Sequence, residues 1–305
     1  MLRLPRAYVY LDTVARAGSI RKAAEQLHVA ATALNRKIKE TEDSLGTPLF
    51  ERLPRGVRLT AAGEVLVAAV RRSMTDVKAA VSHIEHLRGV VRGTVRIGCA
   101  ESVGTDLIPA SIAHYQQTHP AVQFHMASGV TAHLVTSLME DAVDLILVHD
   151  PQPADQIKVL ASVRQPLCAM VRPGHPLASQ SVLRLTDCQK YPVALSNQSF
   201  GSRHLIDAIV ARSSISLKLV LEASTMQSLK EFTRQTDAVS FQYQIGMRRE
   251  VQRGELVAIP LIDRSLSQTR LVLAARAGRM MPIASQSFAN LLEQTLGRLS
   301  IAKTD

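Results

Sequence analysis

The sequence predicts an α/β protein in which a small helical N-terminal domain is followed by a larger, two-lobed α/β domain. Its 305 residues suffice for about two domains of roughly 150 residues each. Positive charge is concentrated at one end, because residues 1–93 hold sixteen Lys and Arg against nine Asp and Glu. Apolar residues follow helical spacing in the first third, and strand-like runs alternate with helical stretches after it.

The composition excludes several classes of protein. With 46% hydrophobic and 20% charged residues, the chain is not disordered. No strongly apolar segment reaches the roughly 18 residues of a membrane span, and the N-terminus lacks the apolar core of a secretory signal, so we expect a cytoplasmic protein that does not bind a membrane. Cys99, Cys168 and Cys188 are odd in number and lack C-x-x-C spacing, which indicates buried thiols and leaves redox activity open.

The first 45 residues predict a helix-turn-helix. Apolar residues at helical spacing mark a helix from Arg6 to Ala17, and Gly18 ends it. Ser19 is suited to cap a second helix over 20–27, and a third helical pattern runs over 30–45. Two short helices joined by a tight turn form the motif, although an ordinary three-helix bundle with a polar face is the alternative.

The third helix and the segment after it predict a DNA-binding surface. Ala33, Leu34 and Ile38 are expected to face the core, which leaves hydrogen-bonding side chains free to enter the major groove. After Pro48 the chain alternates apolar and charged residues, as a β-hairpin would, and its arginines are suited to phosphates or the minor groove. The predicted DNA-binding residues are Ser19, Ala31, Thr32, Asn35, Arg36, Lys39, Arg52, Arg55 and Arg58.

A long amphipathic helix follows over 61–88. Its apolar seam repeats about every 3.6 residues, and no other segment of the N-terminal domain is expected to cover it. We predict that the seam pairs with a second copy, and packing on the chain's own second domain is the alternative. The predicted dimerisation residues are Leu66, Ala69, Val77, Ala80 and Ile84.

The remaining chain predicts a sensor-like body of two lobes. We place the DNA-binding domain at 1–60, a hinge at 89–93 and the effector domain at 94–305. Lobe I comprises about 94–166 and 269–303, and lobe II about 167–268. Strands are predicted at 95–99, 122–126, 144–148, 193–195 and 218–221, in a mostly parallel sheet.

A weak internal repeat aligns Ser128 with Ser224, because Asp-Ala-Val follows thirteen residues later in both copies. A duplicated α/β unit suits a clamshell with a ligand between its lobes, and converging helix N-termini favour a small polar or anionic ligand. Helix capping is an equally good explanation for any one of the serines. The predicted effector-binding residues are Glu101, Ser102, Ser128, Gly129, Thr131, Ser199, Phe200, Ser224 and Thr225.

The stretch GSIRKAAEQLHVAATALNRKIKETEDSLGTPLFERLPRGVRLTAAGE resembles the winged helix-turn-helix of the LysR-type transcriptional regulators. The resemblance continues in VRIG, in LIP at 107–109 and in VRPGHPLA at 171–178. It implies a periplasmic-binding-protein-like effector domain, linker helices that pair antiparallel, and homodimers or homotetramers that affect RNA polymerase access. Departures occur at 30–32 and Asn35, at Glu101, where a small residue is common, and at 236–237.

We therefore predict a ligand-responsive transcriptional regulator that reads an interrupted palindrome in double-stranded DNA and senses a small molecule. The alternatives are a two-lobed α/β enzyme and an architectural DNA-binding protein without a sensor. Nucleophile-elbow, zinc-protease, P-loop and dinucleotide-binding motifs are all missing from the sequence, and the ten His are scattered. We accordingly predict no catalytic residue, no cofactor and no metal site.

Overall fold

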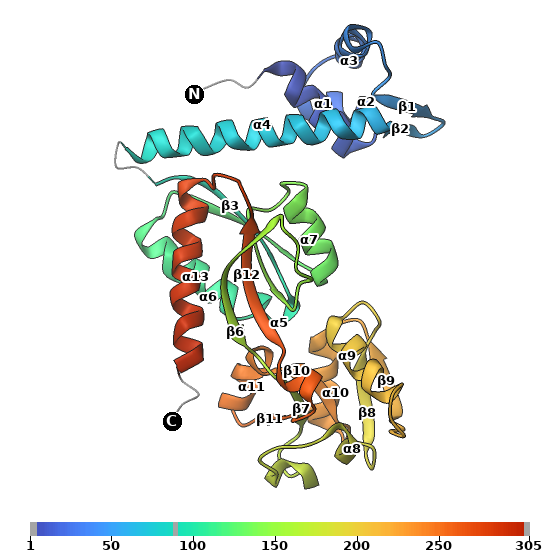
Figure 1. The fold of residues 1–305 in the computed structure, drawn as a ribbon, viewed down its shortest axis with the longest axis vertical. Helices are drawn as coiled ribbons and strands as arrows, with labels where there is room; N and C mark the ends of the chain where they lie inside the picture. Colours follow the sequence, from blue (N-terminus) through green and yellow to red (C-terminus); the bar gives the residue numbers. More distant parts are fainter. Residues whose placement is uncertain (1–4, 88–90, 302–305) are drawn as a thin grey trace. The chain divides into compact units, whose positions relative to one another are not determined.

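The computed structural model describes residues 5–87 and 91–301, which form two compact units (Figure 1). The first unit comprises the residues before the division near residue 90, together with Arg279–Ile283, and the second unit comprises the rest. Residues 88–90, the end of the predicted long helix and the start of the predicted hinge, lie outside the described residues. No described helix is both long and apolar enough to cross a membrane.

Three helices form the core of the N-terminal unit. They are α1 (Arg6–Ala17), α2 (Ile20–Leu27) and α3 (Ala31–Leu45), as the apolar spacing predicts. Gly18 ends α1 in the left-handed conformation, and the Ser19 hydroxyl caps α2 by accepting a hydrogen bond from the Lys22 amide. The prediction for Ala33 is wrong: it is exposed, because Leu34 and Ile38, four residues apart, form the stripe of α3 that packs inward.

The wing is a two-stranded antiparallel hairpin of β1 (Phe50–Leu53) and β2 (Gly56–Leu59). The Val57 amide donates a hydrogen bond of 2.9 Å to the carbonyl of Gly18, which ties the wing to the turn between α1 and α2. Gly56 has φ +141°, and a Cβ there would lie 2.3 Å from the Gly18 oxygen. This close approach requires glycine.

The long helix α4 (Ala61–His86) begins at Thr60, whose hydroxyl accepts a hydrogen bond from the Gly63 amide. Its first turns pack on the helix-turn-helix through Val67 and Val70. This corrects the expectation that nothing in the N-terminal domain covers the helix, because the wing turns the chain back and brings α4 against α1. Of the predicted seam, Leu66 packs against the same core and is half-buried, as are Ala69 and Val77, whereas Ala80 and Ile84 are exposed.

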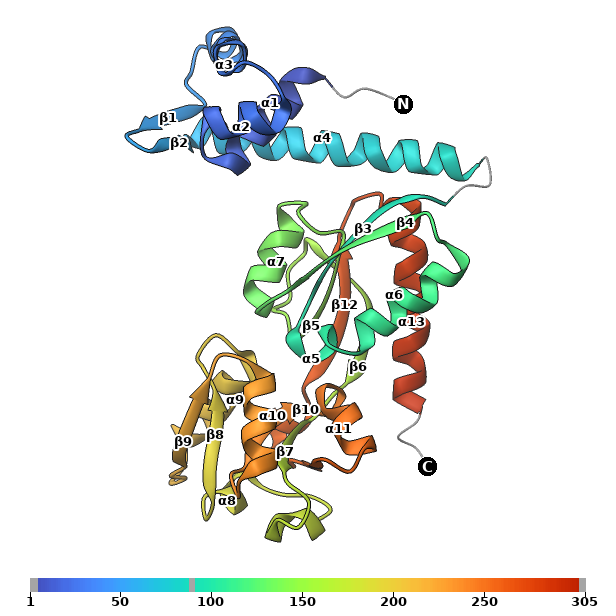
Figure 2. The same cartoon turned by 180° about the vertical axis from the view of Figure 1, so that it is seen from behind.

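Lobe I is built on a five-stranded sheet in the order β4-β3-β5-β12-β6 (Figure 2). The strands β3 (Gly93–Cys99), β4 (Val122–Ser128) and β5 (Leu145–His149) are parallel, whereas β12 (Arg270–Arg276) runs antiparallel to β5 and to β6 (Ile157–Arg164). Helix α7 (Thr131–Met139) covers one face of the sheet. Helices α6 (Leu107–Thr118) and α13 (Ile283–Ile301) cover the other, where Tyr115, Phe124 and Phe288 pack edge to face.

Lobe II contains a three-stranded and a two-stranded sheet. In the first, β7 (Leu167–Val171) pairs antiparallel with β10 (Ser240–Tyr243) and β11 (Val257–Pro260); in the second, β8 (Pro192–Ser196) and β9 (Lys218–Ala223) are parallel. The helical elements are η1 (Pro176–Ser179), α8 (Leu185–Cys188), α9 (Gly201–Val210), α10 (Met226–Gln235), η2 (Gln244–Met247), α11 (Arg248–Gln252) and α12 (Arg264–Ser267).

The lobe I sheet is mixed and the three-stranded sheet of lobe II is antiparallel, so the prediction of a mostly parallel sheet is wrong. The chain crosses between the lobes twice, after β6 and before β12, and the returning strand enters the lobe I sheet in the opposite direction. The five predicted strands are present, and the two aligned serines lead into equivalent elements. Ser128 precedes α7 and β5, and Ser224 precedes α10 and β10.

Candidate functional site

The outer face of α3 presents the side chains expected to enter the major groove. Ala31, Thr32, Arg36 and Lys39 are all exposed. Arg36 lies 3.6 Å from Glu40, but 74% of its side chain is exposed. Such an exposed ion pair is weak, so the guanidinium is free to turn toward a nucleic acid.

Asn35 is coupled to the wing. Its Oδ1 atom accepts a hydrogen bond of 2.8 Å from the Arg52 guanidinium, which extends from β1 to α3. The amide nitrogen of Asn35 remains the group that can donate to a base edge. Arg52, which we predicted to contact DNA phosphates or the minor groove, also orients Asn35.

The other wing arginines differ in their environment. Arg55 is exposed in the turn of the hairpin, whereas Arg58 donates a hydrogen bond of 2.6 Å to Glu51, which raises the pKa of its guanidinium. Glu42, which the sequence analysis missed, accepts hydrogen bonds from the amides of Leu49 and Phe50 at 2.8 and 3.0 Å. It fixes the connection between α3 and the wing.

A shallow apolar groove of about 540 Å³ runs between the start of α4 and the connection that follows α3. Val65 stands in it with 72% of its surface exposed. An apolar groove with so exposed a valine favours contact with another apolar surface. The groove is lined by Leu45, Thr47, Leu49, Ala61, Ala62, Val65, Leu66 and Ala69.

A cavity of about 50 Å³ lies between the lobes of the second unit. Five of the nine predicted effector-binding residues line it, namely Glu101, Ser102, Gly129, Thr131 and Phe200. Val130, Gly201 and Ser202, which belong to the serine-rich segments expected at the cleft, line it as well; the lining residues that were not predicted are Ala100, His149, Met226, Gln242 and Tyr243. Most of them stand at strand or helix ends, as expected for a site between α/β lobes.

The other four predicted residues do not line this cavity. Ser128 lies 3.6 Å from the thiol of Cys99, Ser199 donates to Asn197, and Thr225 caps α10 by accepting from the Ser228 amide. For Thr225 the alternative explanation of helix capping therefore holds. Ser224 is exposed beside it.

His149 is the most distinctive side chain of the cavity. Its Nε2 atom lies 2.8 Å from the Ser102 hydroxyl, and its ring stacks on Tyr243 with centroids 3.5 Å apart. Burial lowers the pKa of His149 to about 3, so the imidazole is neutral at physiological pH. Nδ1 has no partner among the described residues, so no carboxylate supports the imidazole, and its low basicity makes the Ser102–His149 pair a poor catalytic dyad.

Two carboxylates of lobe I reach across to lobe II. Glu101 in the short helix α5 (Glu101–Gly104) accepts a hydrogen bond of 2.9 Å from the Met226 amide at the start of α10. Asp106 forms an ion pair of 2.6 Å with Arg249 of α11. The segment around α5 is therefore held to lobe II at two points.

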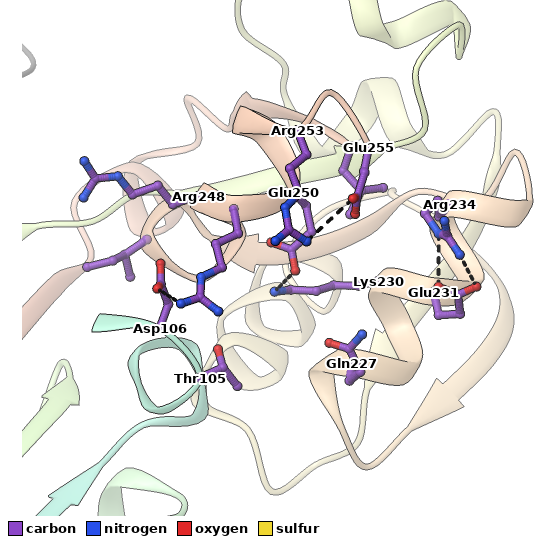
Figure 3. A pocket seen from close by; sticks show the side chains of 14 residues that line it. Thr105, Asp106, Gln227, Lys230, Glu231, Arg234, Arg248, Glu250, Arg253 and Glu255 are labelled. Atoms are coloured by element: carbon purple, nitrogen blue, oxygen red, sulfur yellow. Dashed lines mark hydrogen bonds and ion pairs between the residues drawn. The ribbon is translucent and has the colours of Figure 1, made fainter. Parts of the chain in front are cut away.

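A second hollow of about 350 Å³ is lined by charged side chains of α10 and α11 (Figure 3). Most of its charged side chains form ion pairs, although Arg248 has no such partner among the described residues, and the best buried pair joins Lys230 to Glu250 at 2.7 Å. Figure 3 also shows Arg234 with Glu231 and Arg253 with Glu255, and a further pair joins Asp106 to Arg249. We assign no ligand to this hollow.

The three cysteines are buried, and none of them forms a disulfide. Burial raises the pKa of Cys99 and raises that of Cys188 to about 12, so these two thiols stay protonated and weakly reactive. Within the described ranges, no three His, Cys, Asp or Glu side chains gather as a metal site would require.

Comparison with known proteins identifies both units. Residues 5–64 match the bacterial regulatory helix-turn-helix proteins of the lysR family, and residues 88–297 match the LysR substrate binding domain. The chain belongs to the LysR family. It is a transcriptional regulator with a DNA-binding helix-turn-helix domain and an effector-binding domain.

The relatives of this LysR-type regulator are regulators as well. It is 28% identical to the SDS degradation transcriptional activation protein of a Pseudomonas species over 95% of both chains. It is 24% identical to the RuBisCO operon transcriptional regulator of Allochromatium vinosum over 94% of this chain and 95% of the relative. These names agree with a regulator and disfavour the enzyme alternative.

Solved structures share the fold. A full-length OxyR variant from Pseudomonas aeruginosa aligns with a TM-score of 0.72 at 20% identity, over 96% of this chain and 95% of the other. Full-length CbnR in complex with its target DNA aligns with a TM-score of 0.61 at 16% identity, over 95% of this chain and 99% of the other.

Proposed function

We propose that this LysR-type regulator binds an interrupted palindromic operator as a homodimer or homotetramer, with α3 of each copy in the major groove. The observation that carries the proposal is the exposed polar face of α3 beside the arginine at the wing tip. Thr32 and Arg36 are suited to base edges, and Lys39 and Arg55 to phosphates or the minor groove. An operator with two half-sites follows from two-fold symmetry of the dimer.

The groove along α4 supports pairing with a second copy. Its apolar lining includes the predicted seam residues Leu66 and Ala69, and Val65 projects into it. A partner's α4 is the occupant we propose, because an identical helix offers the same apolar stripe. Assembly into tetramers and contact with RNA polymerase, which the family resemblance implies, belong to the same proposal, as does action in the cytoplasm.

The interlobe cavity is the site we propose for a small polar effector. It combines hydroxyl and amide groups with a neutral imidazole, and it lies where the two lobes meet. A ligand that binds the closed form more tightly than the open form shifts the population toward closure. Closure would alter how dimers associate and bend the operator.

The substitution Val65→Asp tests the dimer in full-length protein. A carboxylate in the apolar groove should weaken self-association by at least about tenfold, because burying an unpaired charge is costly. Analytical ultracentrifugation gives the association constant, and gel shifts with a genomic fragment selected by the wild type give the affinity for DNA. We expect both to fall together.

Val159→Asp is the matched control, since Val159 lies on β6 in lobe I and is 55% exposed. It should change neither property. A Val65→Asp protein that self-associates like the wild type would remove the α4 groove from the interface, whereas absence of any selected fragment would contradict the operator proposal itself.

A further inference from the structure

The N-terminus of α10 is a natural anion subsite of the interlobe cleft. The helix has ten residues and is capped by Thr225, and the first amides of a helix carry positive partial charge without an intrahelical acceptor. One of them, the Met226 amide, points at lobe I. Its partner is a carboxylate of the chain itself, the Oε1 atom of Glu101 at 2.9 Å.

Two buried residues that line the cavity also have polar atoms without a hydrogen-bond partner among the described residues. The amide nitrogen of Gln242 and the Nδ1 atom of His149 are unpaired among the described residues. Gln242 is 1% exposed and His149 7% exposed, and both line the cavity. A buried polar atom without a hydrogen-bond partner is costly, so both atoms favour a ligand or ordered water that would bond to them.

The charges of the cavity disfavour an anionic ligand. Among the described lining residues Glu101 is the one charged side chain, and Arg203, which the sequence offers as a nearby cation, is ion-paired with Asp207 and Glu222. A ligand carboxylate would meet the negative charge of Glu101 and would find the Met226 amide already bonded to it. The cavity of about 50 Å³ also limits the ligand to a few heavy atoms unless the lobes open.

We propose that Glu101 determines the specificity of this cleft: its carboxylate fills the anion subsite at the start of α10, so the cleft takes a small polar ligand that carries no carboxylate. The proposal rests on the proposed effector role of the cleft. It narrows the ligand class to neutral or cationic molecules that hydrogen-bond to Gln242 and His149. It also makes Glu101 a contact that joins the two lobes before any effector binds.

Chemical rescue tests the proposal. The substitution Glu101→Ala should leave a hole of carboxylate size at the start of α10, which free acetate can enter. We expect acetate to raise the melting temperature of full-length Glu101→Ala protein saturably, compared with chloride at equal ionic strength, since a ligand of the native state stabilises it. Acetate should bind this variant on the order of tenfold more tightly than the wild type. Glu101→Ser, the kind of small residue common in the family at this position, should behave in the same way.

Two further variants separate rescue from a general salt effect. Glu101→Gln keeps the side-chain volume and should gain no acetate response. Glu140→Ala removes a carboxylate at the end of α7, outside the cavity, and should also gain none. Neutral acetamide should rescue Glu101→Ala less well than acetate.

The proposal is overturned if acetate stabilises the wild type as strongly as Glu101→Ala, or if neither Glu101→Ala nor Glu101→Ser responds. This outcome is distinct from failure of the proposed function. Acetate rescue concerns the subsite alone and needs no DNA, whereas an effector role fails if no ligand of the cleft changes affinity for the operator.

Discussion

Arg52 donates a hydrogen bond to Asn35, so at the scale of single residues the wing helps to orient a side chain that we expect to read a base. The bond occupies one lone pair of the Asn35 carbonyl and leaves its amide nitrogen as a donor. We therefore expect base recognition by α3 to depend on the wing. An Asn35 that turned freely would lose more side-chain entropy on binding.

The substitution Asn35→Ala should relax sequence preference at one position of each half-site, by about 1–3 kcal/mol of discrimination. Oligonucleotide selection with the purified variant gives the preference at every position. Arg52→Ala should loosen the same position to a smaller extent, because it releases Asn35 without removing it. An unchanged preference in the Asn35→Ala variant would exclude this residue from base recognition.

His149 should make the stability of the effector domain sensitive to acid. Burial lowers the folded-state pKa from 6.5 to about 3, so between these values the unfolded chain binds one proton more than the folded chain. Stability contributed by neutral His149 is thus fully present above pH 6.5 and is lost as the pH falls toward 3, at up to about 1.4 kcal/mol per pH unit.

Comparison with His149→Gln isolates this contribution. The variant keeps a hydrogen-bonding side chain but has no imidazole to titrate, so its free energy of unfolding should fall less steeply between pH 6.5 and 4.5. Denaturant titrations at each pH give both curves, and the background from other groups cancels in their difference. Parallel curves would mean that the histidine is not held neutral by burial.

At the scale of elements, the wing depends on one close contact of its backbone. Gly56 lets β2 approach the turn after α1, and the Val57 amide bonds to Gly18 there. Gly56→Ala should lower the melting temperature and the affinity for DNA together, because the new methyl group forces the wing away from the turn.

Gly46→Ala is a suitable control for strain alone. Gly46 also has a positive φ of +67°, but a Cβ there would meet no atom within 4 Å. The free energy of unfolding of this variant should fall by about 1 kcal/mol, the strain of an alanine in the left-handed conformation, with little effect on the wing. Equal losses in the two variants would contradict a specific role for the contact between Gly56 and Gly18.

Elements with local signals could be predicted from the sequence, and contacts between distant segments could not. Gly18, Ser19 and apolar periodicity define the helices of the N-terminal unit, since caps and spacing act within a few residues. The packing of Val67 and Val70 on α1 depends on the path of the wing, and the antiparallel entry of β12 depends on the crossing between lobes.

In the candidate effector site, too, local features could be predicted and long-range contacts could not. Glu101 and Ser102 could be placed near the cleft because they follow a predicted strand, but the bond from Met226 to Glu101 joins residues far apart in sequence. His149 gave no local signal at the end of its strand, and its role became visible through Ser102 and Tyr243. Long-range pairing of this kind follows from the fold and not from spacing.

At the scale of the whole molecule, the two units have different functions: the first is a basic DNA-binding domain and the second is an effector-binding domain. The excess positive charge of residues 1–93 lies in the unit that presents α3 and the wing. The second unit carries the cavity and its interlobe carboxylates. Separation of this kind lets each surface change without disturbing the fold of the other.

The proposal that the basic N-terminal unit binds DNA is best tested by the salt dependence of binding to a selected genomic fragment. Wild type and Arg55→Ala are compared. We expect affinity to fall steeply as salt rises, and we expect Arg55→Ala to weaken binding to all sequences alike and to reduce the salt slope by about one per contacting copy. Binding insensitive to salt, or an Arg55→Ala loss confined to a single sequence, would contradict the proposal.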